Sequence, residues 1–143
     1  MAYSAVELSK YIITKCARDN KPISNLQLQK ILYFIQKEYL QKKGVPAFDD
    51  PIEAWRFGPV VPEAYYFFCG SGAMPITDVY EDANIDNVTD RALIDKIVED
   101  KRELSPWKLV EETHKEGCAW DRVYQHGLGN RKEIPIGWIR EDE

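Results

Sequence analysis

The sequence predicts a mainly α-helical fold of about five helices, opened by a helical hairpin and carrying one or two short extended or strand segments. Two capped stretches near the start repeat apolar residues at helical spacing, which is the clearest secondary-structure signal in the chain. The length of 143 residues, 44% of them hydrophobic, suits one domain with its own core. No repeat, linker or low-complexity stretch divides the sequence, so we expect a single compact domain over residues 1–143.

The first two helices are predicted from start and stop signals. Ser4 with Glu7 makes a capping box before the first apolar run, and residues 20–22 (Asn-Lys-Pro) end that run. Ser24 with Gln27 repeats the box before the second run. The apolar stripe of the second helix consists of Leu28, Ile31, Leu32, Ile35 and Tyr39. The short connection between the two helices favours a helical hairpin.

The segment after the second helix is expected to be irregular. Residues 51–57 are too short for a helix and end in β-favouring aromatic residues, so we expect an extended or short-strand segment. Residues 58–62 are predicted to form a rigid corner, because Pro59 disfavours the α conformation at Gly58.

The later elements are predicted from proline, serine and glycine signals. Pro62 suits the first position of a helix, and Ser105 followed by Pro106 is a cap with proline at that same position. The predicted elements are, in order, a helix over 63–69, an extended piece at 76–80, a helix over 88–103, a helix from Ser105 to about His114, one or two helical turns over 120–125, and an apolar tail over 134–139 that docks on the core.

The charge balance disfavours nucleic acid as the main partner. The chain has 24 acidic and 19 basic residues, a formal net charge of −5. A protein that neutralises a phosphate backbone usually carries a basic surplus. The overall field of this chain opposes that role.

Nothing in the sequence predicts export or membrane insertion. The first seven residues lack a basic region followed by an apolar run, and no apolar stretch nears the roughly 20 residues of a membrane span. The three cysteines, Cys16, Cys69 and Cys118, are odd in number and unevenly spaced, unlike a secreted disulfide framework. We therefore expect a cytoplasmic protein with no membrane partner.

The sequence offers little support for a metal-binding or a phosphate-binding site. His114, Cys118 and His126 offer one closely spaced pair and a distant third ligand, whereas structural zinc usually takes two closely spaced pairs. The glycines of residues 70–72 lack the lysine and the strand-to-helix setting of a phosphate loop. We expect no metal and no cofactor, and we interpret His114 as a residue at a helix C-terminus that bonds to a neighbouring turn.

Cysteine-based catalysis is the enzymatic alternative. A cysteine nucleophile needs a base beside it and an electropositive setting. Only Cys118 is expected to be exposed near a histidine, either His114 or His126. This hydrolase or transferase hypothesis ranks below a binding function, so we do not expect an enzyme.

Ten aromatic residues lie between positions 33 and 68. Residues 65–68 are four consecutive aromatics that would cover every side of a helix, so at least one is expected to be exposed. Exposed aromatic residues beside prolines and an arginine, here Arg56, are typical of protein-binding hot spots. A well-filled core with tyrosine hydroxyls at its rim explains the same residues, and the sequence leaves both interpretations open.

Three sequence blocks resemble a known family. Residues 24–36 (SNLQLQKILYFIQ) resemble its T-x-L-K-L-Q-K-L-L-Y-x-x-Q helix, and residues 53–65 (EAWRFGPVVPEAY) resemble its E-A-W-x-x-G-P-V-x-P-x-x-Y block. Residues 113–120 (THKEGCAW) resemble its T-H-x-E-x-P-W element. From the first helix to about Trp120, the chain is similar to the Panacea, or SocA-like antitoxin, domain.

The resemblance implies an antitoxin that neutralises a protein toxin encoded beside it. In this family the shared domain is paired with toxins of unrelated kinds and also occurs in phage-associated proteins, and one relative is an adaptor that hands its toxin to a protease. Gln27 stands where the family has lysine and Ala119 where it has proline, and the second change puts the geometry of the last block in doubt. The expected partners are a cognate toxin and, in the adaptor mode, a protease; a homodimer is neither required nor excluded.

The block residues are expected to divide into two groups. In the scaffold group, Trp55 and Tyr65 anchor the corner to the second helix, while Gln29 and Gln36 bond to backbone groups of residues 51–60. The full scaffold group is Leu28, Gln29, Lys30, Tyr33, Gln36, Trp55, Gly58, Pro59, Pro62, Thr113, His114 and Trp120. The group expected to contact the partner is Arg56, Phe57, Val60, Tyr65 and Tyr66.

A second binding hypothesis competes with the antitoxin. The chain is then a phage or prophage regulator that binds a host protein without any toxin. Both hypotheses need a protein-binding surface, so the residues do not distinguish them. The genes beside this one do, because the antitoxin hypothesis requires a toxin gene next to it.

Overall fold

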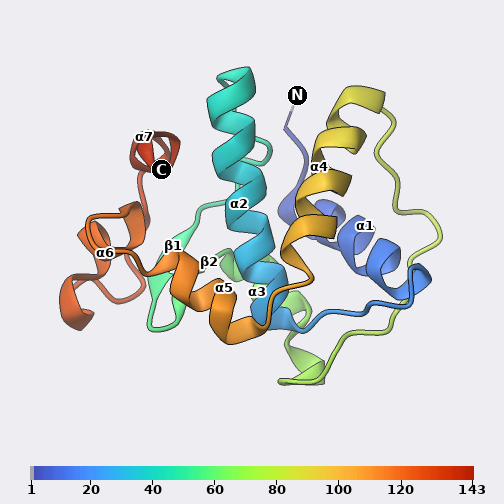
Figure 1. The fold of residues 1–143 in the computed structure, drawn as a ribbon, viewed down its shortest axis with the longest axis horizontal. Helices are drawn as coiled ribbons and strands as arrows, with labels where there is room; N and C mark the ends of the chain where they lie inside the picture. The colour runs from blue at the N-terminus through green and yellow to red at the C-terminus, as the bar shows by residue number, and fades with distance from the viewer. Residues whose placement is uncertain (1) are drawn as a thin grey trace.

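Helices account for most of the described chain, which is residues 2–143 of the computed structural model (Figure 1). In order, the elements are α1 (Ala5–Arg18), α2 (Asn25–Lys43), β1 (Glu53–Trp55), β2 (Gly58–Val60), α3 (Pro62–Phe67), the 3-10 turn η1 (Cys69–Ser71), α4 (Val88–Lys101), α5 (Pro106–Thr113), α6 (Ala119–Tyr124), the 3-10 turn η2 (Gln125–Gly127) and α7 (Ile136–Glu141). The predicted fold class is confirmed: a mainly α, single compact domain with one small two-stranded sheet.

Helix α2 forms the axis of the fold. Helices α1, α3, α4, α5 and α7 and strand β2 all pack against it, and Figure 1 shows it upright between α4 on one side and α6 and α7 on the other. Every side chain from Leu28 to Gln36 is buried, so the helix is covered all round rather than along one apolar stripe. Its polar residues therefore need partners inside the protein.

The starts of α1 and α2 follow the capping signals. The Ser24 hydroxyl accepts from the Gln27 N–H at 3.3 Å, and Gln27 Oε1 accepts from the Ser24 N–H at 2.9 Å, so this capping box is complete. The Ser4 hydroxyl accepts from the Glu7 N–H at 3.0 Å, but the Glu7 carboxylate pairs with Lys10 instead of closing its box. The two helices pack against each other, as the predicted hairpin requires.

Strands β1 and β2 form an antiparallel hairpin, which corrects the predicted rigid corner. Trp55 lies opposite Gly58, and the two residues between them make the turn. Gly58 follows the turn with a φ of 110°, a conformation that favours glycine. Pro59 lies inside β2, where a proline is tolerated because the strand is at the edge of a sheet.

The C-terminal part of the chain covers the outer edge of β1. The Ala54 N–H donates to Lys132 O at 2.9 Å, and the Arg131 N–H donates to Ala54 O at 2.7 Å. The Ile134 N–H then donates to Ile52 O at 2.7 Å. After this ladder the chain forms α7, which packs on α2. The apolar tail docks as predicted, but as a helix that the sequence did not predict.

One carboxylate fastens the end of the chain to the core. The Tyr33 hydroxyl donates to Asp142, and burial together with this bond raises the pKa of Tyr33. Asp142 Oδ1 also accepts from the Ala119 N–H at 2.8 Å. A proline at position 119 would have no N–H to donate. Alanine, which stands here instead of the family's proline, makes the hydrogen bond to Asp142 possible.

The remaining predictions differ from the structure only in detail. Helix α3 ends two residues before the predicted stop, and α4, α5 and α6 lie within about two residues of their predicted bounds. Residues 76–80 contain no strand; the Ile76 N–H donates to Ile23 O at 2.8 Å and the Tyr80 N–H donates to Thr14 Oγ1 at 2.8 Å. Within residues 2–143, no helix combines the length and apolar character that a membrane crossing needs.

Candidate partner-binding site

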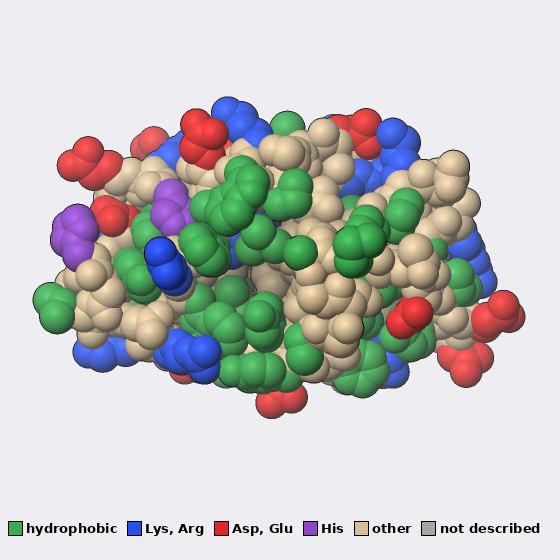
Figure 2. Space-filling view, turned by 90° about the horizontal axis from the view of Figure 1, so that it is seen from below, with side chains coloured by type: hydrophobic (Ala, Val, Ile, Leu, Met, Phe, Trp, Pro, Cys, Tyr) green, Lys and Arg blue, Asp and Glu red, His purple; other side chains and the backbone are tan. Residues whose placement is uncertain are grey.

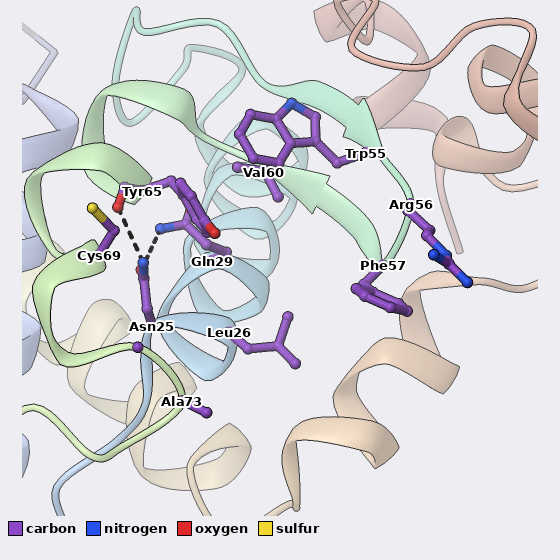
Figure 3. Close-up of a pocket in the computed structure, with 11 residues that line it drawn as sticks. Asn25, Leu26, Gln29, Trp55, Arg56, Phe57, Val60, Tyr65, Cys69 and Ala73 are labelled. Carbon is purple, nitrogen blue, oxygen red and sulfur yellow. Dashed lines mark hydrogen bonds between the residues drawn. The ribbon is translucent and has the colours of Figure 1, made fainter.

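The first turns of α2 provide a polar floor beneath the hairpin. Gln29 Nε2 donates to Asn25 Oδ1 at 2.9 Å, and Gln29 Oε1 accepts from the Val61 N–H at 2.9 Å. Asn25 Nδ2 donates to Tyr65 O at 3.1 Å (Figure 3). Asn25 and Gln29 are buried, so these bonds satisfy groups that water does not reach. The amide pair thereby joins α2 to the end of β2 and to α3.

Lys30 supports the hairpin from below. Its side chain is fully buried, and Nζ donates to Pro59 O at 2.8 Å. Burial lowers the pKa of Lys30 to about 7, because the charged form loses its water. A Cβ on Gly58 would lie 2.8 Å from Lys30 Nζ and 2.9 Å from Thr113 Oγ1. The glycine is what lets the strand rest directly on the lysine.

The third sequence block holds the hairpin from the α5–α6 side. The Trp120 indole N–H donates to Trp55 O at 2.7 Å, and His114 Nε2 lies 3.3 Å from Arg56 O. His114 caps the end of α5, with Nδ1 2.7 Å from Val110 O, and its ring centroid lies 3.8 Å from that of Trp120. His114 thus lies at a helix C-terminus beside a neighbouring turn, as interpreted from the sequence.

An aromatic cluster forms on the outer part of β1. The Trp55 ring packs against Tyr65 at 4.9 Å and against Tyr66 at 5.9 Å between ring centroids. The Arg131 guanidinium lies 4.2 Å from the centre of the Trp55 ring and donates to the Tyr66 hydroxyl at 3.1 Å. The Trp55 indole N–H donates to Glu53 Oε1 at 2.9 Å. Trp55 is therefore fixed by contacts on several sides.

These elements surround an open pocket of about 310 Å³, which Figure 3 shows in close-up. The residues that line it are Asn25, Leu26, Gln29, Trp55, Arg56, Phe57, Val60, Tyr65, Cys69, Gly72 and Ala73. Figure 2 shows hydrophobic side chains gathered around a hollow in the middle of this face, with lysine or arginine side chains at its edge. Apolar side chains such as Leu26, Phe57 and Val60 form much of its lining.

Four of the five residues expected to contact a partner line the pocket, namely Arg56, Phe57, Val60 and Tyr65. Tyr66 does not line it and lies exposed beside it. Phe57 packs edge-on against Trp107 of α5 at 5.3 Å, and Trp107 is 61% exposed. Trp107 therefore extends the apolar surface, although no sequence pattern had singled it out. Contact between these residues and a partner stays a prediction.

The sequence also missed one wall of the pocket. Leu26 belongs to the first block, whereas Cys69 is the last residue of the predicted helix over 63–69 and Ala73 follows the glycines of residues 70–72, and neither was predicted to line a site. No signal in the sequence places residue 73 near residue 26, because their proximity depends on how α3 packs. Such a wall is found only in the folded chain.

Two contacts of the scaffold residues differ from the prediction. Gln36 bonds to an earlier segment than expected: Nε2 donates to Phe48 O at 2.9 Å and Oε1 accepts from the Ala47 N–H at 2.8 Å. The target of Gln29, Val61, lies one residue beyond the expected stretch. Leu28 and Tyr33 are buried in the core, and Pro62 begins α3.

The cysteine and histidine residues are not arranged for catalysis. Both ring nitrogens of His114 face backbone carbonyls, and the Cys118 thiol donates to Thr113 O at 3.4 Å. Burial raises the pKa of the Cys118 thiol, which opposes thiolate formation. In the part of the chain that the structure describes, Cys118 bonds to neither histidine, and no three His, Cys, Asp or Glu side chains group as a metal would require.

We expect Gln29→Leu to lower the free energy of unfolding by about 2 kcal/mol, because it leaves the buried Val61 N–H without an acceptor. Urea unfolding followed by circular dichroism measures the change. Gln125→Leu is the control, since Gln125 is exposed and its side chain donates to the nearby Arg122 O, and it should change stability by less than about 0.5 kcal/mol. Equal stability of the two variants would show that the Gln29 amide does not hold the hairpin.

The comparisons with known proteins agree with the sequence blocks. A family model described as "Antitoxin SocA-like, Panacea domain" matches residues 28–121. The chain is 32% identical over 133 residues to "Antitoxin SocA" of Caulobacter vibrioides (strain NA1000 / CB15N), an alignment that covers 85% of this chain and 70% of that protein. No solved structure gives a significant match. The matched range includes the hairpin, Gln29 and Lys30 beneath it, and the His114–Trp120 contact.

Proposed function

Because the chain belongs to the SocA-like antitoxin family with the Panacea domain, we propose that it neutralises a protein toxin by binding it directly through the face that carries the pocket. Family membership supports an antitoxin role and implies a toxin partner. Direct binding through this face is the further step that we propose. The observation that carries it is an open apolar pocket held rigid by residues of all three blocks.

The rigidity of the face supports a binding function. Its hairpin is held by Lys30 beneath, by Gln29 at one end and by Trp120 at the other. A surface fixed before binding loses little conformational entropy when a partner docks. Exposed aromatic residues such as Phe57 and Trp107 supply contact area at its rim.

We propose a role without catalysis. An antitoxin family suggests a non-enzymatic protein. The enzymatic alternative required Cys118 as a thiolate with a histidine base, whereas its thiol donates to a backbone carbonyl. Replacing Cys118 with alanine removes the required thiolate and leaves His114 in place, so it is expected to leave toxin neutralisation intact once the variant is shown to be folded.

The test is co-expression with the neighbouring gene. Expression of that gene alone should stop growth, and co-expression of this chain should restore it by at least about a hundredfold in colony count. The two products should co-elute in size-exclusion chromatography, where light scattering gives the stoichiometry and shows whether the antitoxin is dimeric. A toxic neighbour that neither binds nor responds to this chain would contradict the proposal.

The same cells distinguish the mechanisms. If binding alone neutralises the toxin, its half-life should be unchanged when this chain is co-expressed. A half-life that falls, and recovers in a strain that lacks the responsible protease, would identify the adaptor mode. A neighbour that is harmless while this chain captures a host protein would favour the regulator hypothesis instead.

A further inference from the structure

The size of the pocket indicates what enters it. A volume of about 310 Å³ lies at the lower end of small-molecule sites, which span about 300–1,000 Å³. One large apolar side chain, or two small ones, would occupy such a space. The opening lies on an exposed face between the hairpin and the stretch after α3, so a side chain can enter from a docked protein.

The interior of the pocket is suited to an apolar group. The side-chain amides of its floor already form hydrogen bonds within the protein, because Gln29 bonds to the Asn25 side chain and to the Val61 N–H. What remains available is the hydrocarbon and ring surface of residues such as Leu26, Trp55 and Val60. A charged side chain placed here would lose its water without gaining a partner.

The edge of the pocket is cationic in a protein whose net charge is −5. Arg56 lines the pocket at the tip of the hairpin, where Figure 3 shows it next to Phe57. In the described chain neither Arg56 nor Arg131 pairs with a carboxylate, while Arg102 pairs with Asp19 at 2.8 Å. Arg131 lies on the Trp55 ring instead. An exposed guanidinium beside an apolar pocket is complementary to a carboxylate beside an apolar side chain.

We infer that the pocket binds an aromatic or long aliphatic side chain of the toxin and that a carboxylate next to that side chain pairs with Arg56. This inference rests on the proposed function and adds the chemistry of the toxin segment. The segment is acidic and carries one apolar anchor. The anchor provides most of the affinity, and the ion pair sets its orientation and the rate of association.

The test fills the pocket without disturbing the core. Ala73 lines the pocket and is exposed, so Ala73→Trp should occupy the space while the fold is kept. We expect it to weaken toxin binding at least about tenfold, measured as Kd by calorimetry with the purified product of the neighbouring gene. Met74→Trp is the matched control, because Met74 is the next residue, is 68% exposed and does not line the pocket. Its Kd should stay within about twofold of wild type.

The ion pair is tested by charge reversal. Arg56→Glu should weaken binding about tenfold and reduce its dependence on salt, whereas Lys96→Glu, on the exposed side of α4, should change neither. An aspartate- or glutamate-to-lysine change in the toxin segment should restore binding to Arg56→Glu.

The outcomes separate this inference from the proposed function. If Ala73→Trp binds the toxin as well as the wild-type chain does, the pocket does not bind a toxin side chain. The antitoxin function would still stand. If Ala73→Trp weakens binding but Arg56→Glu does not, the inferred pairing of a toxin carboxylate with Arg56 is wrong. A wild-type chain that neither binds nor protects would overturn both the function and the inference.

Discussion

Gly58→Ala is expected to destabilise the protein by about 3–5 kcal/mol, the largest effect of any single change proposed for this chain. The φ of Gly58 is 110°, which an alanine adopts only with strain. Its Cβ would also lie within 3.0 Å of Lys30 and Thr113 atoms, and the buried Lys30 side chain has no open space into which to retreat. The hairpin would have to lift from α2.

Thermal unfolding followed by circular dichroism measures this effect, and a loss of about 10–17 °C in Tm is expected for a domain of this size. Gly137→Ala is the matched control. Gly137 lies inside α7, has no atom within 4 Å of an added Cβ, and does not have a positive φ. Alanine there should be neutral or stabilising by up to about 1 kcal/mol. Similar loss of stability in both variants would contradict the role assigned to Gly58.

The second large effect is a pH dependence that originates in Lys30. Burial lowers its pKa to about 7 in the folded protein, whereas a lysine in the unfolded chain titrates near 10.4. Below about pH 7 both states carry the proton, and the folded state bears the full cost of the buried charge. Between about pH 7 and 10 the unfolded state binds more protons, so the free energy of unfolding rises with pH at about 1.4 kcal/mol per unit.

Lys30→Met removes this dependence, because methionine has a similar shape and no charge. The difference in unfolding free energy between wild type and Lys30→Met should shift by about 3 kcal/mol in favour of wild type from pH 6 to pH 9.5. Taking the difference cancels groups that both proteins share, such as the Cys118 thiol, whose pKa burial raises. Urea unfolding at four or five pH values gives the curve. Parallel curves for the two proteins would show that Lys30 titrates alike in both states.

The sequence predicted the features that depend on neighbouring residues. The Ser24–Gln27 box and Pro62 mark helix starts because their hydrogen bonds and backbone limits act within one helical turn. Arg56 and Phe57 line the pocket, and their contact with a partner stays a prediction. The sequence blocks also identified the family without any structural information.

Other features depend on residues that are distant in the sequence. The apolar spacing of α2 predicted one buried stripe, but burial of Lys30 and Gln36 requires cover from elements placed far along the chain. Residues 58–62 were interpreted as a corner because Pro59 disfavours the α conformation at Gly58, and only the pairing of residues 58–60 with β1 makes them a strand. Helix α7 is too short to show a reliable period, and it forms where α2 offers an apolar surface.

By itself, the sequence determined the fold class, the starts of α1 to α5 and the antitoxin family. Capping hydrogen bonds, the backbone limits of proline and the family's motifs all lie within short stretches of contiguous residues. Only the tertiary structure decided that the pocket exists. Its floor comes from α2, its edge from the hairpin and its wall from the stretch around Ala73, three segments that meet solely through packing. It also decided the role of Gly58, whose missing side chain makes room for a lysine 28 residues earlier in the chain, a space that no local pattern reveals.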